Sequence, residues 1–334
     1  MKEDHQESCP YCANYVQVIS DDHIFPAFLG GKRTIRCCKP CNDRFGHTFE
    51  AGAASFLQQL HVFVCSWGLT LKKDAFWREA YTHEGISLDL SASEGGVAMR
   101  PSKPQVKPLP DGSWFMDGFG SLEEAEQAAR RRVKRGKIRD FEVGQTPLPK
   151  TLPGLTVTLE IGPHIRRLAI KMCMGLSALL PEFHVDDMTE ARPILYDPSI
   201  DPNNTMDDYE IYTAIDSSRP PLSHLIYVER NAGRVYGVVQ FFGAIQIFCR
   251  LGETKHRSGD SALLAFLDPL SGAEEFHVRP VLSLVEPPVA GFLRDPRLIL
   301  RWLEKFRVEA IARGATHPPE TTSVKIEVTP NRTD

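Results

Sequence analysis

The chain has 334 residues, of which 42% are hydrophobic and 25% are charged, and its formal net charge is −4. These values are ordinary for globular proteins and exclude collagen-like, coiled-coil and wholly disordered chains. The slight negative charge excludes a uniformly basic nucleic-acid coat, although it is compatible with a local basic patch. No apolar stretch approaches the ~20 residues that span a bilayer. The polar first residues do not resemble a secretory signal, so we expect a cytoplasmic protein without a membrane partner.

The cysteines are the first unusual feature, because five of the eight lie within the first 41 residues. In a chain without a secretory signal, such a cluster indicates a metal site rather than disulfides. Two Cys-X-X-Cys pairs are present, and this spacing lets two thiolates on one turn occupy neighbouring corners of a zinc tetrahedron. The predicted ligands of one structural zinc are Cys9, Cys12, Cys38 and Cys41. Cys37 is the alternative to Cys38, but it is separated from Cys41 by three residues instead of two.

The segment between the two pairs reads DDHIFPAFLGG from residue 21, and the second pair continues as CNDRFG from residue 41. The order CxxC, DHIxP, LGG, CxxCN and FG resembles the HNH endonuclease family, and within it the zinc-knuckle branch of the ββα-metal nucleases. The resemblance covers roughly residues 9–50, and its five ordered motifs make it specific. The two glycines lack the Lys-Ser/Thr ending of a phosphate-binding loop, so they predict the turn between the two motif strands.

The resemblance implies a metal-dependent hydrolysis of phosphodiester bonds. A histidine can take the proton of the attacking water, and a divalent cation can stabilise the phosphate and the departing oxygen. By position, His23 is the general base, and Asp22 and Asn42 are the ligands of Mg²⁺ or Mn²⁺, which prefer oxygen ligands. Asp21 is the alternative to Asp22, but neighbouring residues of a strand face opposite sides, so we expect it outside the ligand set.

The chain departs from the family pattern between the glycines and the second cysteine pair. Many family members carry an asparagine there that orients the base, whereas residues 32–37 read KRTIRC. The resemblance therefore leaves the orientation of His23 unexplained. His47 is an alternative metal ligand, although it lies five residues after Asn42, about 140° around a helix. Taken singly, Asp22 is typical of a turn and Asn42 of a helix cap, so their assignment depends on the whole motif.

Beyond the motif, apolar residues at helical spacing predict a helix over 50–66 that packs against it. Short strands are expected at 86–90, 96–100 and 114–119, and the four prolines of 101–110 predict an extended connection. Ser121 and Glu124 form a capping box that predicts the start of a helix. Its basic residues include Arg130, Arg131, Arg132, Lys134, Arg135 and Lys137. Such residues are favourable near any helix C-terminus, and the functional alternative is contact with nucleic-acid phosphates.

The prolines of 147–153 predict a domain boundary. Beyond them, the patterns predict a strand at 155–161 and a mostly buried helix at 163–180. Consecutive strands of an antiparallel meander are expected at 224–229 and 235–251, followed by another strand at 261–267, a helix at 296–313 and a last strand at 323–328. Residue 243, a glycine, is expected at a bend of this meander. The sequence therefore predicts an α+β protein whose ββα-metal zinc finger precedes an α+β region with an antiparallel sheet.

Three regions are predicted: the finger with its packing helix at 1–66, a strand-rich extension with the basic helix at 67–150, and a C-terminal α+β domain without an assigned role at 151–334. The leading hypothesis is an endonuclease that cuts DNA in bacterial defence against phage or in restriction, an expectation from the family. The sequence does not distinguish DNA from RNA. The alternatives are a zinc knuckle that binds nucleic acid or protein without catalysis, and a nuclease subunit controlled by a partner or ligand through residues 151–334.

Overall fold

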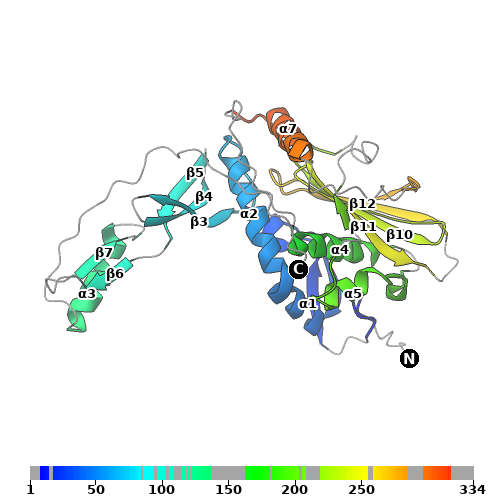
Figure 1. The fold of residues 1–334 in the computed structure, drawn as a ribbon, viewed down its shortest axis with the longest axis horizontal. Helices are drawn as coiled ribbons and strands as arrows, with labels where there is room; N and C mark the ends of the chain where they lie inside the picture. Colours follow the sequence, from blue (N-terminus) through cyan, green and yellow to red (C-terminus); the bar gives the residue numbers. More distant parts are fainter. Residues whose placement is uncertain are drawn as a thin grey trace.

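The computed structural model combines helices with antiparallel sheets and so confirms the predicted α+β class (Figure 1). It describes residues 8–14, 18–83, 86–93, 96–102, 105–108, 114–117, 119, 122–136, 162–180, 183–202, 205–207, 219–254, 259–284 and 296–316. The strands predicted at 155–161 and 323–328 lie outside the described residues. None of the helices in the described ranges is both long and apolar enough to cross a membrane.

The N-terminal region is a β-hairpin followed by a helix. Strand β1 (Ile19–His23) pairs antiparallel with β2 (Thr34–Cys38), and a short helical turn, η1 (Ala27–Leu29), lies between them. This turn ends at Gly30, whose φ of 98° is the left-handed conformation that favours glycine. The glycine pair therefore forms the link between the two strands, as predicted.

Three helical segments follow β2 without a break: α1 (Lys39–Phe45), the π-helical turn η2 (Gly46–Glu50) and α2 (Ala51–Cys65). The last of these is the helix predicted over 50–66. The buried rings of Phe45 and Phe49 contact each other, and Phe45 also contacts Tyr11 from the first cysteine turn. These rings pack the helical segments against the cysteine turn and position the residues that follow the second cysteine pair.

The extension consists of two small sheets and one helix. Strands β3 (Phe76–His83), β4 (Ile86–Ser93) and β5 (Gly96–Pro101) form an antiparallel sheet that packs against α2, and β6 (Gln105–Pro108) pairs with β7 (Trp114–Asp117). The helix α3 (Leu122–Lys134) follows, beside β6 and β7 in Figure 1. Strands β4, β5 and β7 match the predicted segments, whereas the sequence patterns missed β3 and β6.

The C-terminal region is built on a six-stranded antiparallel sheet with the order β13-β12-β9-β10-β11-β8. Its strands are β8 (Thr205–Asp207), β9 (His224–Asn231), β10 (Arg234–Phe241), β11 (Ile245–Glu253), β12 (Ser261–Leu267) and β13 (Glu274–Arg279), and its helical segments are α4 (Pro163–Ser177), η3 (Val185–Asp187), α5 (Ala191–Tyr196) and α7 (Pro296–Ala312). The predicted strands are confirmed: β9, β10 and β11 form a meander with its bend at Gly243, and β12 pairs with the other side of β9.

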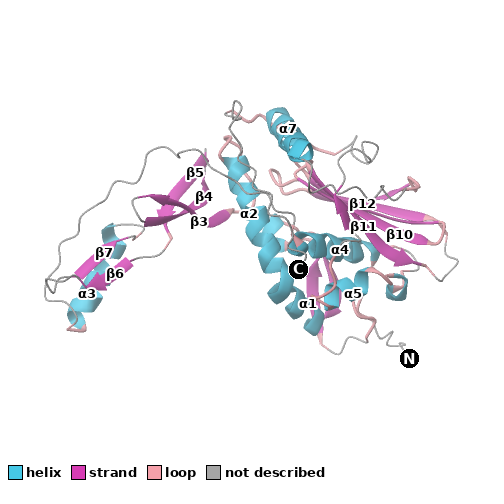
Figure 2. Ribbon diagram, in the orientation of Figure 1, coloured by secondary structure: helices cyan, strands magenta, loops and turns pink. Residues whose placement is uncertain are grey.

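Helix α4 joins the finger to this sheet (Figure 2). Every residue from Ile165 to Ser177 is buried, and the helix contacts β9, β10 and β11 on one side and η2 and α2 on the other. One continuous apolar cluster runs from the cysteine turn through α4 into the sheet. The finger and the C-terminal sheet therefore share a core, and α4 lies at its centre.

Two neutral imidazoles are buried where α2 meets β9. The rings of His61 and His224 lie 5.9 Å apart, and neither ring nitrogen of His61 has a hydrogen-bond partner among the residues that the structure describes. Burial lowers the pKa of His61 to about 4 and that of His224 well below its usual range. Protonation of either ring is therefore unfavourable in the folded protein.

We expect His61 to make the fold acid-sensitive. Its folded-state pKa is below that of the unfolded chain, so the unfolded state binds more protons between the ordinary pKa of 6.5 and about 4. Stability is therefore lost as the pH falls through this window, by about 2 kcal/mol from this group at about pH 5. Urea unfolding should show that His61→Leu loses less stability than the wild type between about pH 7 and about pH 5. Equal losses in both proteins would contradict the prediction.

Candidate functional site

The four cysteines predicted to bind zinc come together in the structure. The sulfur atoms of Cys9, Cys12, Cys38 and Cys41 all lie within 4.8 Å of one another. The Cys12 and Cys38 sulfurs are 3.7 Å apart. Since Zn–S bonds are about 2.3 Å long, tetrahedral geometry requires sulfur–sulfur distances of about 3.8 Å. The donor set and its spacing fit a structural zinc, and the cluster includes Cys38 rather than Cys37.

A tyrosine from the C-terminal region contacts this cluster. The hydroxyl of Tyr196, at the end of α5, lies 2.7 Å from the sulfur of Cys41. A hydrogen bond from Cys41 lowers the pKa of Cys9 to about 4, so the cluster favours a thiolate at Cys9. Tyr196 belongs to no cysteine motif and is far from the cluster in the sequence, so sequence analysis missed it.

Asp22, the predicted metal ligand, is buried and bonded through both carboxylate oxygens. Tyr11 donates its hydroxyl hydrogen to Oδ2 at 2.5 Å, and the ammonium of Lys171 donates to Oδ1 at 2.6 Å. Lys171 lies on α4 and also forms an ion pair with Glu50, at 2.5 Å from Oε1. Sequence analysis missed Tyr11 and Lys171 as partners of Asp22, and Glu50 as the second partner of Lys171. The signal that could have found Lys171 is a charged residue in the middle of a predicted buried helix.

The electrostatics of this buried group favour the charged form of Lys171. Burial opposes the ammonium, but the carboxylates of Asp22 and Glu50 raise the pKa of Lys171 above its ordinary value. Burial and the nearby Asp22 raise the pKa of Tyr11 well above its usual range, so its hydroxyl stays neutral and donates. An ammonium therefore already neutralises part of the charge of these two carboxylates.

The predicted catalytic residues divide between the two faces of β1. Asp22 is buried, whereas Asp21 and His23 on either side of it are more exposed, as the alternation of a strand requires. Asn42 donates its amide hydrogens to Ser20 Oγ at 2.7 Å and to the Asp21 carbonyl at 3.2 Å. Ser20 and Asp22 share the inner face of the hairpin, toward the helix, so the structure brings Asn42 to the face of Asp22.

His23 lies on the outer face, directly opposite Thr34 of β2. Its ring is half-buried and forms no hydrogen bond or ion pair with another residue in the described part of the chain. The structure therefore does not place His23 on the same side of the strand as Asp22 and Asn42. His47, the alternative ligand, is exposed on η2.

A divalent cation does not fit the Asp22 site as it is arranged. Mg²⁺ needs oxygen ligands at 2.0–2.1 Å in near-octahedral geometry, and both Asp22 oxygens are engaged by Tyr11 and Lys171. Among the described residues, the four cysteines are the only place where three or more His, Cys, Asp or Glu ligand atoms gather. The structure thus supports the zinc site, while Lys171 opposes a second metal at Asp22.

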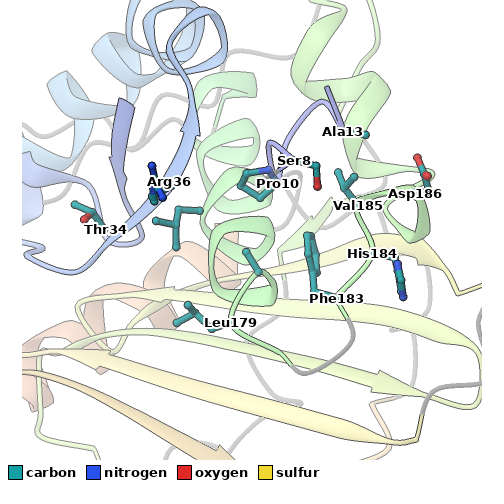
Figure 3. Close-up of a pocket in the computed structure, with 12 residues that line it drawn as sticks. Ser8, Pro10, Ala13, Thr34, Arg36, Leu179, Phe183, His184, Val185 and Asp186 are labelled. Carbon is teal, nitrogen blue, oxygen red and sulfur yellow. The ribbon is translucent and has the colours of Figure 1, made fainter. Parts of the chain in front are cut away.

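A pocket of about 470 Å³ opens beside β2. Figure 3 shows that Ser8 and Pro10 of the first cysteine turn, Arg36 of β2, and Phe183 and His184 ahead of η3 surround it. Thr34, which pairs with His23, also lines it. The pocket therefore opens on the same strand pair as His23, although neither His23 nor Asp22 lines it.

The predicted basic segment lies on α3 and just beyond it. Arg130, Arg131, Lys134 and Arg135 are exposed, and Arg132 is half-buried. Lys137 lies outside the described residues. One of these side chains, that of Arg130, lies 3.5 Å from Glu126 on the same helix. This ion pair is exposed and its distance is long, so it contributes little to the stability of the protein.

Comparison with known proteins identifies the N-terminal region. Residues 9–56 match the model of the HNH endonuclease family. No curated protein and no solved structure matches the chain. The matched segment contains both cysteine pairs, the hairpin, α1 and η2, so the resemblance predicted from the motifs is confirmed over these residues. The match supports a nuclease that acts on nucleic acid, and the extension and the C-terminal sheet lie outside it.

Proposed function

We propose that the protein is an endonuclease that hydrolyses phosphodiester bonds in DNA through its HNH region. The family match over residues 9–56 carries this proposal, because that segment contains His23 and the cysteine cluster in a ββα arrangement. In the reaction, a water oxygen attacks phosphorus and a phosphorus–oxygen bond of the backbone breaks. His23 is the proposed general base, which takes the proton of that water.

The environment of His23 supports this role. Imidazole is the side chain whose ordinary protonation equilibrium lies closest to neutral pH. The ring is half-buried and has no side-chain partner among the described residues, so a nitrogen can accept a proton from water. Pairing of β1 with β2 holds its backbone opposite Thr34. A general base must lie within hydrogen-bond reach of the water that it deprotonates, and a ring without a protein partner leaves a nitrogen for that contact.

The proposal includes Mg²⁺ or Mn²⁺, with Asp22 and Asn42 as the ligands that the family implies. Such a cation, when bound, stabilises the charge on the phosphate and the departing oxygen. Asn42 suits the role, because both of its hydrogen bonds to described residues use its amide nitrogen and leave its oxygen available. Asp22 can take the role only after Lys171 leaves its carboxylate.

The setting of the activity is also part of the proposal. We place the enzyme in the cytoplasm, in bacterial defence against phage or in restriction, as the family resemblance implies. The exposed basic side chains on α3 and at Arg135 are proposed to contact nucleic-acid phosphates. RNA is the alternative substrate, and a regulatory protein or ligand is proposed to act through residues 151–334.

One observation favours a second candidate, a zinc knuckle that binds nucleic acid or protein without cutting. The carboxylate predicted to hold the catalytic metal is bonded to Tyr11 and Lys171. A site that stays in this state would keep the fold and the zinc of the family but not its metal chemistry.

Cleavage of supercoiled plasmid with Mg²⁺ or Mn²⁺ tests the proposal. We expect the wild type to cut, and His23→Ala to lose activity by about 10²–10⁴-fold, the usual contribution of a general base. His277→Ala is the control, because it removes a half-buried imidazole on β13, outside the matched segment, and should keep its activity. No cleavage by the wild type of plasmid, single-stranded DNA or RNA would favour the binding module. Equal cleavage by wild type and His23→Ala would show that His23 is not the base.

A further inference from the structure

A buried group of charges links the finger to helix α4. We call Asp22, Glu50 and Lys171 the ion cluster. The Lys171 side chain is 1% exposed, and those of Asp22 and Glu50 are 5% and 20% exposed. Asp22 comes from β1, Glu50 from the end of η2, and Lys171 from the middle of α4. The cluster therefore forms only when α4 is docked on the hairpin and its helix.

The cluster is costly unless its members stay together. A buried ammonium or carboxylate without a partner strongly destabilises a protein, so each charge here depends on the others. Lys171 lies in a helix whose neighbouring side chains join the apolar core, including Ile170 and Met172. A leucine or methionine would fill this position in an ordinary core helix. The presence of a lysine at this point indicates that the two carboxylates need a cation.

We propose that Lys171 is the resident cation of the Asp22–Glu50 site, and that its docking keeps divalent metal ions away from Asp22. Access of a divalent cation is thereby controlled by the seating of α4. The effect of this metal exclusion on catalysis rests on the proposed nuclease function, whereas the occupancy of the site by Lys171 is independent of that function.

The distances from Lys171 to the two carboxylates show that the ammonium and a divalent metal ion cannot both bind these oxygens. The Lys171 nitrogen lies 2.6 Å from Asp22 Oδ1 and 2.5 Å from Glu50 Oε1, so it occupies the space between the two carboxylates. A metal ion bonded to the same oxygens would lie within a few ångströms of the ammonium. A divalent cation and an ammonium at such a separation repel each other strongly, because the site is buried and screening by water is weak. The metal therefore enters only when Lys171 leaves.

The geometry of α4 explains how such an exchange can be coupled to the rest of the chain. Gly175, one turn after Lys171, faces the finger: a Cβ there would lie 3.4 Å from the Tyr11 hydroxyl, an ordinary contact distance, so this side of α4 lies directly against the finger. The opposite side of the helix contacts β9, β10 and β11. A partner or ligand that displaces α4 from the finger would withdraw Lys171 from Asp22.

Direct metal binding tests the proposal without any assay of cleavage. Mn²⁺ binding to the full-length, zinc-loaded protein is measured by electron paramagnetic resonance and calorimetry. Lys171→Met should bind one Mn²⁺ at least about tenfold more tightly than the wild type, because the competing charge is gone. The double variant Asp22→Asn with Lys171→Met should lose this gain. Lys73→Met, which removes an exposed lysine, is the control and should bind as the wild type does.

Stability gives a second measurement on the same proteins. Lys171→Met leaves two buried carboxylates without a counter-charge, so its melting temperature should fall and should rise again when Mn²⁺ is added. The melting temperature of the wild type should respond much less. Equal Mn²⁺ affinity in wild type and Lys171→Met would overturn the proposal.

The Mn²⁺ affinities of the wild type and of Asp22→Asn test the proposal even if Lys171→Met does not fold. If Lys171 excludes the metal, Asp22→Asn should leave the weak Mn²⁺ affinity of the wild type unchanged. Loss of tight Mn²⁺ binding in Asp22→Asn would show that Asp22 already holds metal and would overturn the proposal. Cleavage by Lys171→Met separates this proposal from the nuclease function. If Lys171→Met gains Mn²⁺ and also cuts plasmid that the wild type leaves intact, both are supported. If it gains Mn²⁺ but does not cut, the nuclease function is refuted while the role of Lys171 stands.

Discussion

Replacement of Cys41 by serine is expected to release the zinc and unfold the finger. Cys41 is buried, contacts the sulfur of Cys38 at 3.1 Å and lies beside the hydroxyl of Tyr196. Structural zinc in small domains contributes about 10 kcal/mol or more to folding, which exceeds the stability of most domains. Metal analysis should find about one zinc per chain in the wild type and less than about half in the variant.

The loss should extend beyond the finger, because the finger has no separate core. The cysteines belong to the same apolar cluster as α4 and the inner face of the C-terminal sheet. We therefore expect thermal unfolding of Cys41→Ser to begin at a much lower temperature and to include the signal of α4. Cys37→Ser is the matched control, since Cys37 is buried beside the cluster but outside it. Retention of a full equivalent of zinc by Cys41→Ser would contradict the four-thiolate site.

The zinc knuckle was predictable because the two cysteines of each pair are close together in the sequence. Two ligands on one turn need a spacing of two residues, and this spacing is visible in the sequence. The same holds for the turn at Gly30 and for the meander of β9 to β11, whose apolar runs and turn residues are contiguous. Each of these features depends on residues that are neighbours in the chain.

The ion cluster could not be predicted because its members are distant in the sequence. Lys171 is 149 residues from Asp22, and no motif relates the two. Only the packing of α4 against the finger brings the ammonium to the carboxylate. Whether Asp22 is available to a metal ion thus depends on α4, a helix outside the motif that predicted this ligand.

The division of the catalytic residues between two faces was within reach of the sequence. Strand alternation separates Asp21 from Asp22, and the same rule separates Asp22 from His23. The family resemblance, in contrast, assigns Asp22 and His23 to one site. In the structure, Asp22 lies on the inner face of the hairpin and His23 on the outer face. The proposed metal ligand and the proposed base therefore have different surroundings.

The missed strands lack the usual signals. In β3 the pairing with β4 is interrupted between Trp77 and Tyr81, and Glu79 has a positive φ of 51°, so no regular alternation appears. Strand β13 is an edge strand with no fully buried residue. Such strands are held by neighbouring strands rather than by their own apolar pattern.

Replacement of Gly31 by alanine is expected to destabilise the finger by about 3 kcal/mol or more, because a Cβ at this position would lie 1.8 Å from the carbonyl oxygen of Phe25. The contact is with the backbone, so no side-chain rotation can relieve it. Phe25 follows His23 by two residues, so the segment that links His23 to β2 would have to move. We therefore expect a lower denaturation midpoint and, if the nuclease proposal holds, lower activity than the loss of stability alone explains.

Gly46→Ala is the matched control for this prediction. Gly46 lies at the junction of α1 and η2 with helical backbone angles, and a Cβ there meets nothing within 4 Å. Alanine should therefore stabilise this position by about 0.5–1 kcal/mol through its higher helix propensity. Urea unfolding of the two variants should move in opposite directions from the wild type. Equal stability of Gly31→Ala and the wild type would show that the link between β1 and β2 can relax, and that its second glycine is not needed to hold His23 in place.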